Sequence, residues 1–351
     1  MVQQRIFGLA LLVALASGLC FSPVVPTQAD TADIVIQLAQ GELPDQVGIR
    51  PSRPDFLGEG PQALAVSPAG EFFILDTLNN RIIRYQPAAD QYTLIPLPEG
   101  TGAFDLAFQA DHLYVLDGVQ GVVWQLDLSG GVVNTYPFDT RQVGALSSHL
   151  AVTTDGQVHW LLLNRQDIVL PPADETVAAG GTTASVAPVV SAAGGAPVTV
   201  INNSRQLYVK PVRSGPNRGN LLVHQADGQP VISLAVAVEQ ILGSATLIAV
   251  DAAGNYYALV EQLLQEAPGF QVETTVWQFS PTGVHLGTAR VPLELGELLP
   301  HRFVAVDSWG GAYFLGVQAG AATIHRLEFT PGAVSQRVPV QAPVMTRFTF
   351  P

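Results

Sequence analysis

Short apolar runs alternate with clusters of turn-forming residues along most of the chain. The stretch Gly60–Tyr85 shows the unit, in which Ser-Pro-Ala-Gly and Asp-Thr-Leu-Asn-Asn separate three apolar runs, Leu64–Val66, Phe72–Leu75 and Ile82–Tyr85. Runs this short, rich in β-branched and aromatic residues and joined this tightly, predict consecutive antiparallel strands. Gly70 can take a positive φ without steric cost, which suits it to the first of these turns.

The first apolar run recurs along the chain at intervals of 42, 44, 48, 50 and 56 residues. A period of this length with four strand patterns per unit predicts a β-propeller, in which each blade buries its faces against its neighbours. We therefore predict an all-β fold, a six-bladed β-propeller with four-stranded antiparallel blades. The six first strands are expected at Leu64–Val66, Leu106–Phe108, Leu150–Val152, Val198–Val200, Ile248–Val250 and Val304–Val306.

Two strand-like segments lie outside this repeat and bear on how the ring closes. Ile34–Leu38 precedes the first blade, and Met345–Phe350 follows the last one. Because a closed ring hides its edges by pairing terminal strands within one blade, we expect Ile34–Leu38 to complete the last blade. Val334–Val340 is expected as an outer strand of the same blade. Blade 4 is the faintest of the six in the sequence.

A low-complexity insertion interrupts the third blade at residues 171–197. It consists mostly of Ala, Gly, Thr, Ser, Val and Pro. So few large side chains cannot offset the entropy lost on ordering, and we predict a flexible surface loop. A tolerated insertion and a tether for a partner are the two readings of its role.

The first residues of the chain have the parts of a secretory signal peptide. Arg5 is followed by a mainly apolar stretch, Ile6–Phe21, and by small residues that end at Ala29. We predict that residues 1–29 are removed and that 30–351 form one exported propeller domain, secreted or periplasmic, without stable insertion into a membrane.

Two other fates of this leader remain open from the sequence. The apolar stretch Ile6–Val25 is nearly long enough for an uncleaved membrane anchor, and Cys20 is a candidate for a lipid anchor. Cys20 is the single cysteine of the chain. A chain cleaved after Ala29 therefore has neither a disulfide nor a reactive thiol.

The chain is strongly acidic, with 29 Asp and Glu residues against 16 Lys and Arg residues and a formal net charge of −13. Nucleic acids and anionic membrane surfaces are bound by clustered basic residues, so both are excluded as partners. The charge favours a soluble monomer and a weak attraction for cations.

The unit Gly60–Tyr85 resembles an NHL-type repeat, which implies a propeller blade and a scaffolding role. The preceding Leu57-Gly58-Glu59-Gly60-Pro61 resembles the motif before the first blade of the gluconolactonase (senescence-marker-protein) family, which is also six-bladed. That resemblance implies a divalent cation bound by Glu59. The family has a Trp after this motif, where Ala63 stands here. Its other ligands and its acid/base occupy repeat positions that read here Phe104, Ser148, Ala196, Thr246 and Arg302.

A second set of residues lies at the loops that lead into the first strands. Asp105 and His149 occupy the same repeat position in adjacent blades, and His301 precedes the sixth first strand. With Glu59, these side chains are candidate oxygen and nitrogen ligands for Ca²⁺, Mg²⁺ or Zn²⁺ at the channel mouth. Solvated loop residues are the alternative, and the sequence implies no other cofactor.

The sequence contains no Gly-x-Ser-x-Gly elbow, phosphate loop, dinucleotide fingerprint or His-Glu-x-x-His motif. Without a complete catalytic set, a non-catalytic binding or scaffold module that uses its channel face is the favoured function, with an unknown protein, peptide or glycan as partner. The alternative is a metal-dependent hydrolase or lyase of the gluconolactonase-like type. We expect the recurring carboxylates to cap turns; these are Asp76, Asp117, Asp251 and Asp307.

Overall fold

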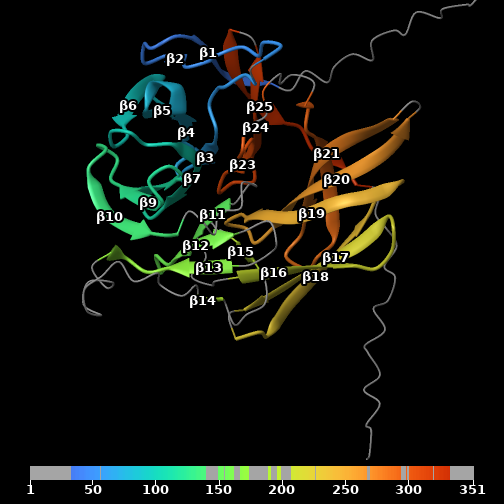
Figure 1. The fold of residues 1–351 in the computed structure, drawn as a ribbon. Coiled ribbons are helices and arrows are strands. Elements are labelled where there is room, and N and C mark those ends of the chain that lie inside the picture. The colour runs from blue at the N-terminus through green and yellow to red at the C-terminus, as the bar shows by residue number, and fades with distance from the viewer. Residues whose placement is uncertain are drawn as a thin grey trace, which may run out of the picture. The chain divides into compact units, whose positions relative to one another are not determined.

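Six antiparallel sheets make up the described part of the chain (Figure 1). No helix within that part is long and apolar enough to cross a membrane. The predicted signal peptide lies outside it. The computed structural model describes residues 33–332, apart from 56, 140–148, 154, 162–166, 174–188, 191–195, 199–206, 226, 267–268, 294–297, 299 and 319.

The first three sheets are four-stranded meanders, so sequential strands are neighbours. A short 3-10 helix, Thr77–Asn79, joins the second and third strands of the first blade. The strands are β3 (Leu64–Val66), β4 (Phe72–Asp76), β5 (Arg81–Gln86) and β6 (Gln91–Pro96) in blade 1; β7 (Ala103–Gln109), β8 (His112–Asp117), β9 (Val122–Leu126) and β10 (Val132–Pro137) in blade 2; and β11 (His149–Val152), β12 (Val158–Leu161), β13 (Asp167–Leu170) and β14 (Val189–Val190) in blade 3.

The last three sheets contain the longest strands, and two of them gain a fifth strand from a distant part of the chain. The strands are β15 (Ala196–Val198), β16 (Leu207–Arg213), β17 (Arg218–Gln225) and β18 (Pro230–Ala237) in blade 4; β19 (Ile241–Val250), β20 (Tyr256–Glu266), β21 (Gly269–Phe279), β22 (His285–Arg290) and β26 (Thr330–Pro331) in blade 5; and β23 (Val304–Val306), β24 (Ala312–Gln318), β25 (Ala321–Leu327), β1 (Ile34–Gln40) and β2 (Gln46–Val47) in blade 6.

The predicted six-bladed all-β propeller is confirmed. Five of the six expected first strands are part of the innermost strand of their blade, and Figure 1 labels β3, β7, β11, β15, β19 and β23 along the inner sides of their sheets. In blade 4 the innermost strand is Ala196–Val198, which begins two residues before the expected Val198–Val200. Gly70, Gly156, Gly254 and Gly310 have φ between +80° and +88° in the turns that follow these strands. The sequence therefore identified both the strand and the turn that repeat.

Blade 6 closes the ring with the N-terminal strand, as expected. β1 pairs antiparallel with β25, with Ile36 opposite Ile324 and Leu38 opposite Ala322. Ile36 and Leu38 are buried in the cluster between blades 6 and 1. The segments Val334–Val340 and Met345–Phe350 lie outside the described residues. The outer position expected for the first of them is filled by β1.

The predicted insertion 171–197 contains strands at two places, so its boundaries need correction. Val189 and Val190 pair with Val169 and Ile168 of β13 as the outer strand of blade 3. Ala196–Val198 forms the innermost strand of blade 4. Both segments are short and have the same composition as their surroundings. The strands that they pair with lie in other parts of the chain, so the sequence of the segments does not reveal the pairing.

A small residue and a large ring face each other in every blade. One residue of each innermost strand pairs with an aromatic residue or histidine of the second strand. Pro197 fits among them because innermost strands are edge strands, where proline is tolerated. The six pairs are Ala65–Phe73, Ala107–Tyr114, Ala151–His159, Pro197–Tyr208, Ala249–Tyr257 and Ala305–Tyr313.

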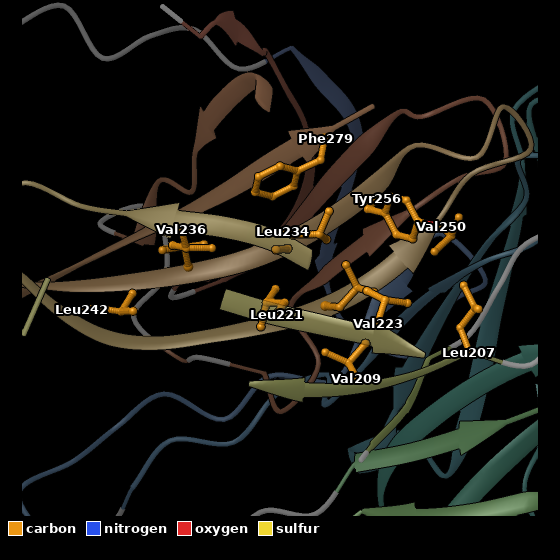
Figure 2. Packing of buried hydrophobic residues seen from close by; sticks show 13 residues of the cluster. Leu207, Val209, Leu221, Val223, Leu234, Val236, Leu242, Val250, Tyr256 and Phe279 are labelled. Atoms are coloured by element: carbon orange, nitrogen blue, oxygen red, sulfur yellow. The ribbon is translucent and has the colours of Figure 1, made fainter. Parts of the chain in front are cut away.

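Apolar clusters lie between five of the six pairs of adjacent blades. Figure 2 shows the cluster between blades 4 and 5, in which Leu221, Val223 and Phe279 are buried. Among the described residues, blades 3 and 4 share no such cluster. His159 and Tyr208 instead form an edge-on ring contact there. Stacking of blades against their neighbours therefore supplies most of the apolar burial.

The prediction that the recurring carboxylates cap turns is confirmed for Asp117, Asp251 and Asp307, whereas Asp76 makes no side-chain capping hydrogen bond. Asp117 is fully buried, and its Oδ1 accepts from the backbone N–H groups of Gly102, Val119 and Gln120, while its Oδ2 accepts from the indole of Trp124. Asp251 and Asp307 are likewise buried and hydrogen-bonded to the turns beside them. Asp76 is also buried, but it accepts from the backbone N–H of Gly48 and from the side chain of Arg81.

Replacing Asp117 by alanine is expected to lower the free energy of unfolding by about 2–3 kcal/mol, because several buried N–H donors lose their acceptor together. Urea denaturation of the two proteins measures the difference. Asp127→Ala is the matched control, since Asp127 accepts from Ser129 and Gly131 in an exposed turn. Equal losses for the two variants would contradict the assignment of a buried structural role to Asp117.

Candidate functional site

A carboxylate at the inner end of blade 2 is the centre of the site. Asp105 lies in β7 just after an irregularity, since Ala103 pairs with Asp117 but Asp105 pairs with Leu116. The extra residue, Phe104, shifts the alternation of side chains by one position. The bulge places Asp105 in the interior, where its side chain is fully buried.

Both oxygens of Asp105 are occupied by hydrogen-bond donors. Oδ1 accepts from the Leu106 backbone N–H at 2.9 Å and from Arg302 Nε at 2.7 Å. Oδ2 accepts from the Leu150 backbone N–H at 2.6 Å and from Arg302 Nη2 at 2.7 Å. An ionised carboxylate offers about four acceptor positions, so this one has little capacity left for another ligand.

Arg302 joins four blades at this point. Its backbone extends blade 6 onto blade 1, because Arg302 N–H donates to Gln62 O at 3.1 Å and Leu64 N–H donates to Arg302 O at 2.9 Å. Its guanidinium forms the bidentate pair with Asp105 of blade 2, and Nη2 also donates to Leu150 O of blade 3 at 2.6 Å. Hydrogen bonds of Arg302 therefore link blade 6 to blades 1, 2 and 3.

The pKa of Asp105 reflects two opposing influences. Burial by itself raises the pKa of this carboxyl, because it penalises the charged form. The adjacent Arg302 charge and its hydrogen bonds outweigh burial and hold the pKa below its ordinary value. Asp105 is therefore ionised at neutral pH, with its charge balanced by Arg302.

Two imidazoles lie beside this ion pair. The rings of His149 and His301 have centroids 4.7 Å apart, and His301 meets the ring of Phe104 edge-on at 5.7 Å. His149 Nδ1 is 4.0 Å from Asp105 Oδ2. Ligand atoms of Asp105, His149 and His301 all lie within 4.8 Å of one another. The structure thus brings together three of the four residues singled out by the sequence.

His149 is neutral at pH 7. Desolvation lowers its pKa to about 4, and the positive charge of Arg302 acts in the same direction, while Asp105 opposes both. Half of the side-chain surface is exposed (50%), so water limits this effect. On either count the imidazole is uncharged and can donate or accept a hydrogen bond.

Glu59 lies elsewhere and does not join the other three. Its Oε2 is 2.6 Å from Arg50 Nη1, and its backbone exchanges two hydrogen bonds with Arg50. Both side chains are about half exposed. The cluster expected from the sequence is corrected accordingly. The residue that approaches Asp105 is a cation, Arg302, and not a further carboxylate.

The cluster of Asp105, His149 and His301 has the nitrogen and oxygen ligands that Zn²⁺ takes, but its carboxylate is already held by a guanidinium. A cation at this point would meet the positive charge of Arg302. Ca²⁺ and Mg²⁺ require six or more oxygen ligands, and one occupied carboxylate does not provide them.

An apolar rim continues from the imidazoles along blade 2. Phe104 lies against Gly118, where an added Cβ would be 2.6 Å from its ring. Val119, the next residue, is 75% exposed and covers Gly102. Leu57, in the loop leading into blade 1, is 88% exposed. Exposed apolar side chains are therefore present in the loops that lead into blade 1 and follow the second strand of blade 2.

Sequence reasoning missed Arg302 as a site residue. It is 197 residues from Asp105, and no motif links the two. The scarcity of basic residues in this acidic chain was the one available signal. A buried arginine needs an anionic partner, and the isolated Arg302 beside the innermost strand β23 pointed to one.

The other histidines have structural roles in the described part of the chain. His159 is buried, and its Nδ1 lies 2.8 Å from Asp167 Oδ1. His285 and His325 contact the hydroxyls of Thr288 and Thr323, respectively. These contacts agree with the expectation of hydrogen-bonded sheet residues.

No protein-family model matches this sequence, and no curated protein is significantly similar to it. Solved propellers are similar in fold. Virginiamycin B lyase from Staphylococcus aureus is 9% identical, with 76% of this chain and 94% of that chain covered at a TM-score of 0.41. A member of the DUF4221 family from Bacteroides vulgatus is 10% identical, with 85% and 97% covered at 0.46. A PQQ-bound aldose sugar dehydrogenase from Streptomyces coelicolor is 14% identical, with 77% and 94% covered at 0.42.

Similarity at this level shows the fold alone. It assigns no substrate, cofactor or reaction to this protein. The fold and the site define a six-bladed β-propeller with a structural Asp–Arg pair near its axis and two imidazoles beside it.

Proposed function

We propose that this protein is a non-catalytic binding module that takes its ligand at the channel face around His149 and His301. One observation carries the proposal: the acceptor positions of Asp105, the buried carboxylate beside the two imidazoles, are filled by Arg302 and two backbone N–H groups. The sequence offers no complete catalytic set to accompany the two imidazoles at this face.

The chemistry of the face favours an extended peptide with apolar or aromatic side chains. The rings of His149, His301 and Phe104 form a contiguous row, and Val119 extends it with aliphatic surface. Aromatic and aliphatic groups with few charges are typical of the centre of a protein interface. The imidazole of His149, whose pKa is lowered by desolvation, can add a hydrogen bond to a peptide backbone without a cost for burying charge.

The same proposal includes an exported monomer, from the signal peptide and the acidic composition of the sequence. It excludes a nucleic-acid partner because basic residues are few, 16 in 351.

The test is selection of phage-displayed random dodecapeptides on the immobilised protein lacking residues 1–29. We expect enrichment of sequences rich in apolar and aromatic residues. His149→Ala with His301→Ala should abolish their binding, because the double change removes two of the three rings. Val133→Ala is the matched control, since Val133 is an exposed apolar residue of the outer strand β10. Peptides that bind the double variant as well as the parent would contradict the proposal.

A metal-dependent hydrolase or lyase is the second candidate, favoured by the convergence of ligand atoms within 4.8 Å. Elemental analysis of the purified protein separates the two. The binding module is expected to carry less than a tenth of an equivalent of zinc and to show no rise in melting temperature with micromolar Zn²⁺. A metal that binds the native state would stabilise it by mass action. If the parent protein contained stoichiometric zinc and the His301→Ala variant did not, the metal-dependent enzyme would become the favoured function.

A further inference from the structure

The turns between first and second strands lie at the opposite end of the blades from the imidazoles. In an antiparallel meander, the loop that leads into the first strand and the turn that follows it are at opposite ends. The turn of blade 6 there carries Trp309, which is 71% exposed. Trp160, by contrast, is fully buried, while Trp124 and Trp277 are half-buried and use their indole N–H groups in internal hydrogen bonds.

Trp309 is held in place from its own turn. Oδ1 of Asp307 accepts from the backbone N–H groups of Trp309 and Gly311, each at 2.8 Å. Oδ2 of the same carboxylate accepts from the hydroxyl of Tyr313 at 2.8 Å. Asp307 is buried, so these bonds are shielded from water. The backbone beneath the indole is thus fixed before any ligand arrives.

The neighbouring blades support this turn on both sides. Ser308 Oγ donates to Pro68 O of blade 1 at 2.9 Å, and Ala252 N–H of blade 5 donates to Ser308 O at 3.0 Å. The indole lies next to Gly70, where an added Cβ would be 3.2 Å from Cζ3. A larger residue than glycine at this point would displace the ring.

The carboxylates of the three linked turns are either buried, as Asp251 and Asp307 are, or paired, as Glu71 is with Arg84. The exposed members of these turns around the indole have small or compact side chains, and the indole N–H makes no hydrogen bond with any described residue. These members are Pro68, Ala69, Ala252 and Ala253.

We propose that Trp309 and these turns form a binding platform for a neutral polysaccharide, separate from the channel face. An indole offers a broad apolar ring on which the C–H face of a sugar packs, and an N–H that can donate to a hydroxyl. A ring already fixed by its turn loses little conformational entropy on binding. Small neighbours leave room for adjacent sugar units.

Two observations favour a glycan over a protein at this surface. The apolar area consists of one large ring among methyl-sized groups, whereas protein interfaces gather several large anchors. The net charge of −13 repels acidic partners but leaves a neutral sugar unaffected. A single aromatic ring among small groups matches the size of one sugar ring.

The experiment measures binding of the protein lacking residues 1–29 to microcrystalline cellulose and chitin by sedimentation, and to cellohexaose and chitohexaose by calorimetry and tryptophan fluorescence. We expect saturable binding to one of the two glycan types. Trp309→Ala should weaken it at least tenfold, and Trp309→Tyr, which keeps a ring, should weaken it less. The fluorescence change on binding should disappear in both variants.

Val133→Ala serves as the matched control, because it removes exposed apolar surface on an outer strand without touching the platform. His149→Ala should bind the glycan like the parent, so failure of the channel-face proposal and of this one are distinguishable. No binding by the parent, or unchanged binding by Trp309→Ala, overturns the inference. Concentration-dependent self-association that disappears in Trp309→Ala would instead make the surface a protein interface and would also overturn it.

Discussion

Deleting Ile34–Leu38 is expected to abolish the folded state of the whole ring at 25 °C. The segment supplies most of β1, which pairs with β25 and covers the cluster between blades 6 and 1. Loss of the buried Ile36 and Leu38 alone costs about 2–5 kcal/mol each. The exposed ladder of β25 adds to this, and the total approaches the roughly 5–15 kcal/mol that separates folded from unfolded domains.

Circular dichroism and differential scanning calorimetry of the truncated protein measure this result. Two point variants make the test independent of expression: Leu38→Ala should lower the free energy of unfolding by about 2–4 kcal/mol, and its exposed neighbour Gln37→Ala should change it by less than about 0.5 kcal/mol. A truncated protein that melts in one unchanged transition would show that β1 is dispensable for closure.

Arg302→Met is expected to lower the free energy of unfolding by about 3–5 kcal/mol, because it leaves the buried Asp105 charge without its partner. Chemical denaturation monitored by tryptophan fluorescence gives the value. The double variant Asp105→Leu with Arg302→Met should recover part of the loss, since replacing both members of a buried ion pair by apolar residues is often near neutral. If Arg302→Met were as stable as the parent protein, the ion pair with Asp105 would not stabilise the fold.

The contribution of Asp105 to the free energy of unfolding should change with pH in opposite directions in the parent protein and in Arg302→Met. In the parent, the pKa of Asp105 is lowered on folding, so its contribution is fully present above the unfolded pKa of about 3.9 and is lost as pH falls through the folded value. In Arg302→Met, burial without the cation should raise the pKa of Asp105. That variant should therefore gain stability relative to the parent as pH falls from 7 to 4. If the free energies of unfolding of the two proteins changed with pH in parallel, the ion pair would not be the origin of the pH dependence.

The repeat of strands was accessible to the sequence because it depends on neighbours along the chain. Leu64–Val66, Gly70 and Phe72–Leu75 lie within one hairpin, so the apolar run and the positive φ of Gly70 are properties of a few consecutive residues. Closure by Ile34–Leu38 was also predicted, because unpaired sheet edges are unfavourable whatever the partner. The identity of the outer strands was harder to predict, as β14 and β26 show with two residues each.

The candidate site was predicted in part. The shared repeat position of Asp105 and His149 indicated that they would approach the axis together, and His301 followed from its place before the sixth blade. The bulge at Phe104 could not be foreseen, because it depends on how β7 pairs with β8. Without that bulge, the alternation of the strand would have directed Asp105 to the other face.

The sequence by itself determined the fold class, the number of blades, the capped turns and the acidic surface, because each of these follows from local pattern or composition. Only the tertiary structure decided the chemistry near the axis. It pairs Arg302 with Asp105, which is 197 residues away in the sequence, and it pairs Glu59 with Arg50. A charged side chain pairs with whichever opposite charge the closed ring brings within a few ångströms, and spacing along the chain does not specify that partner.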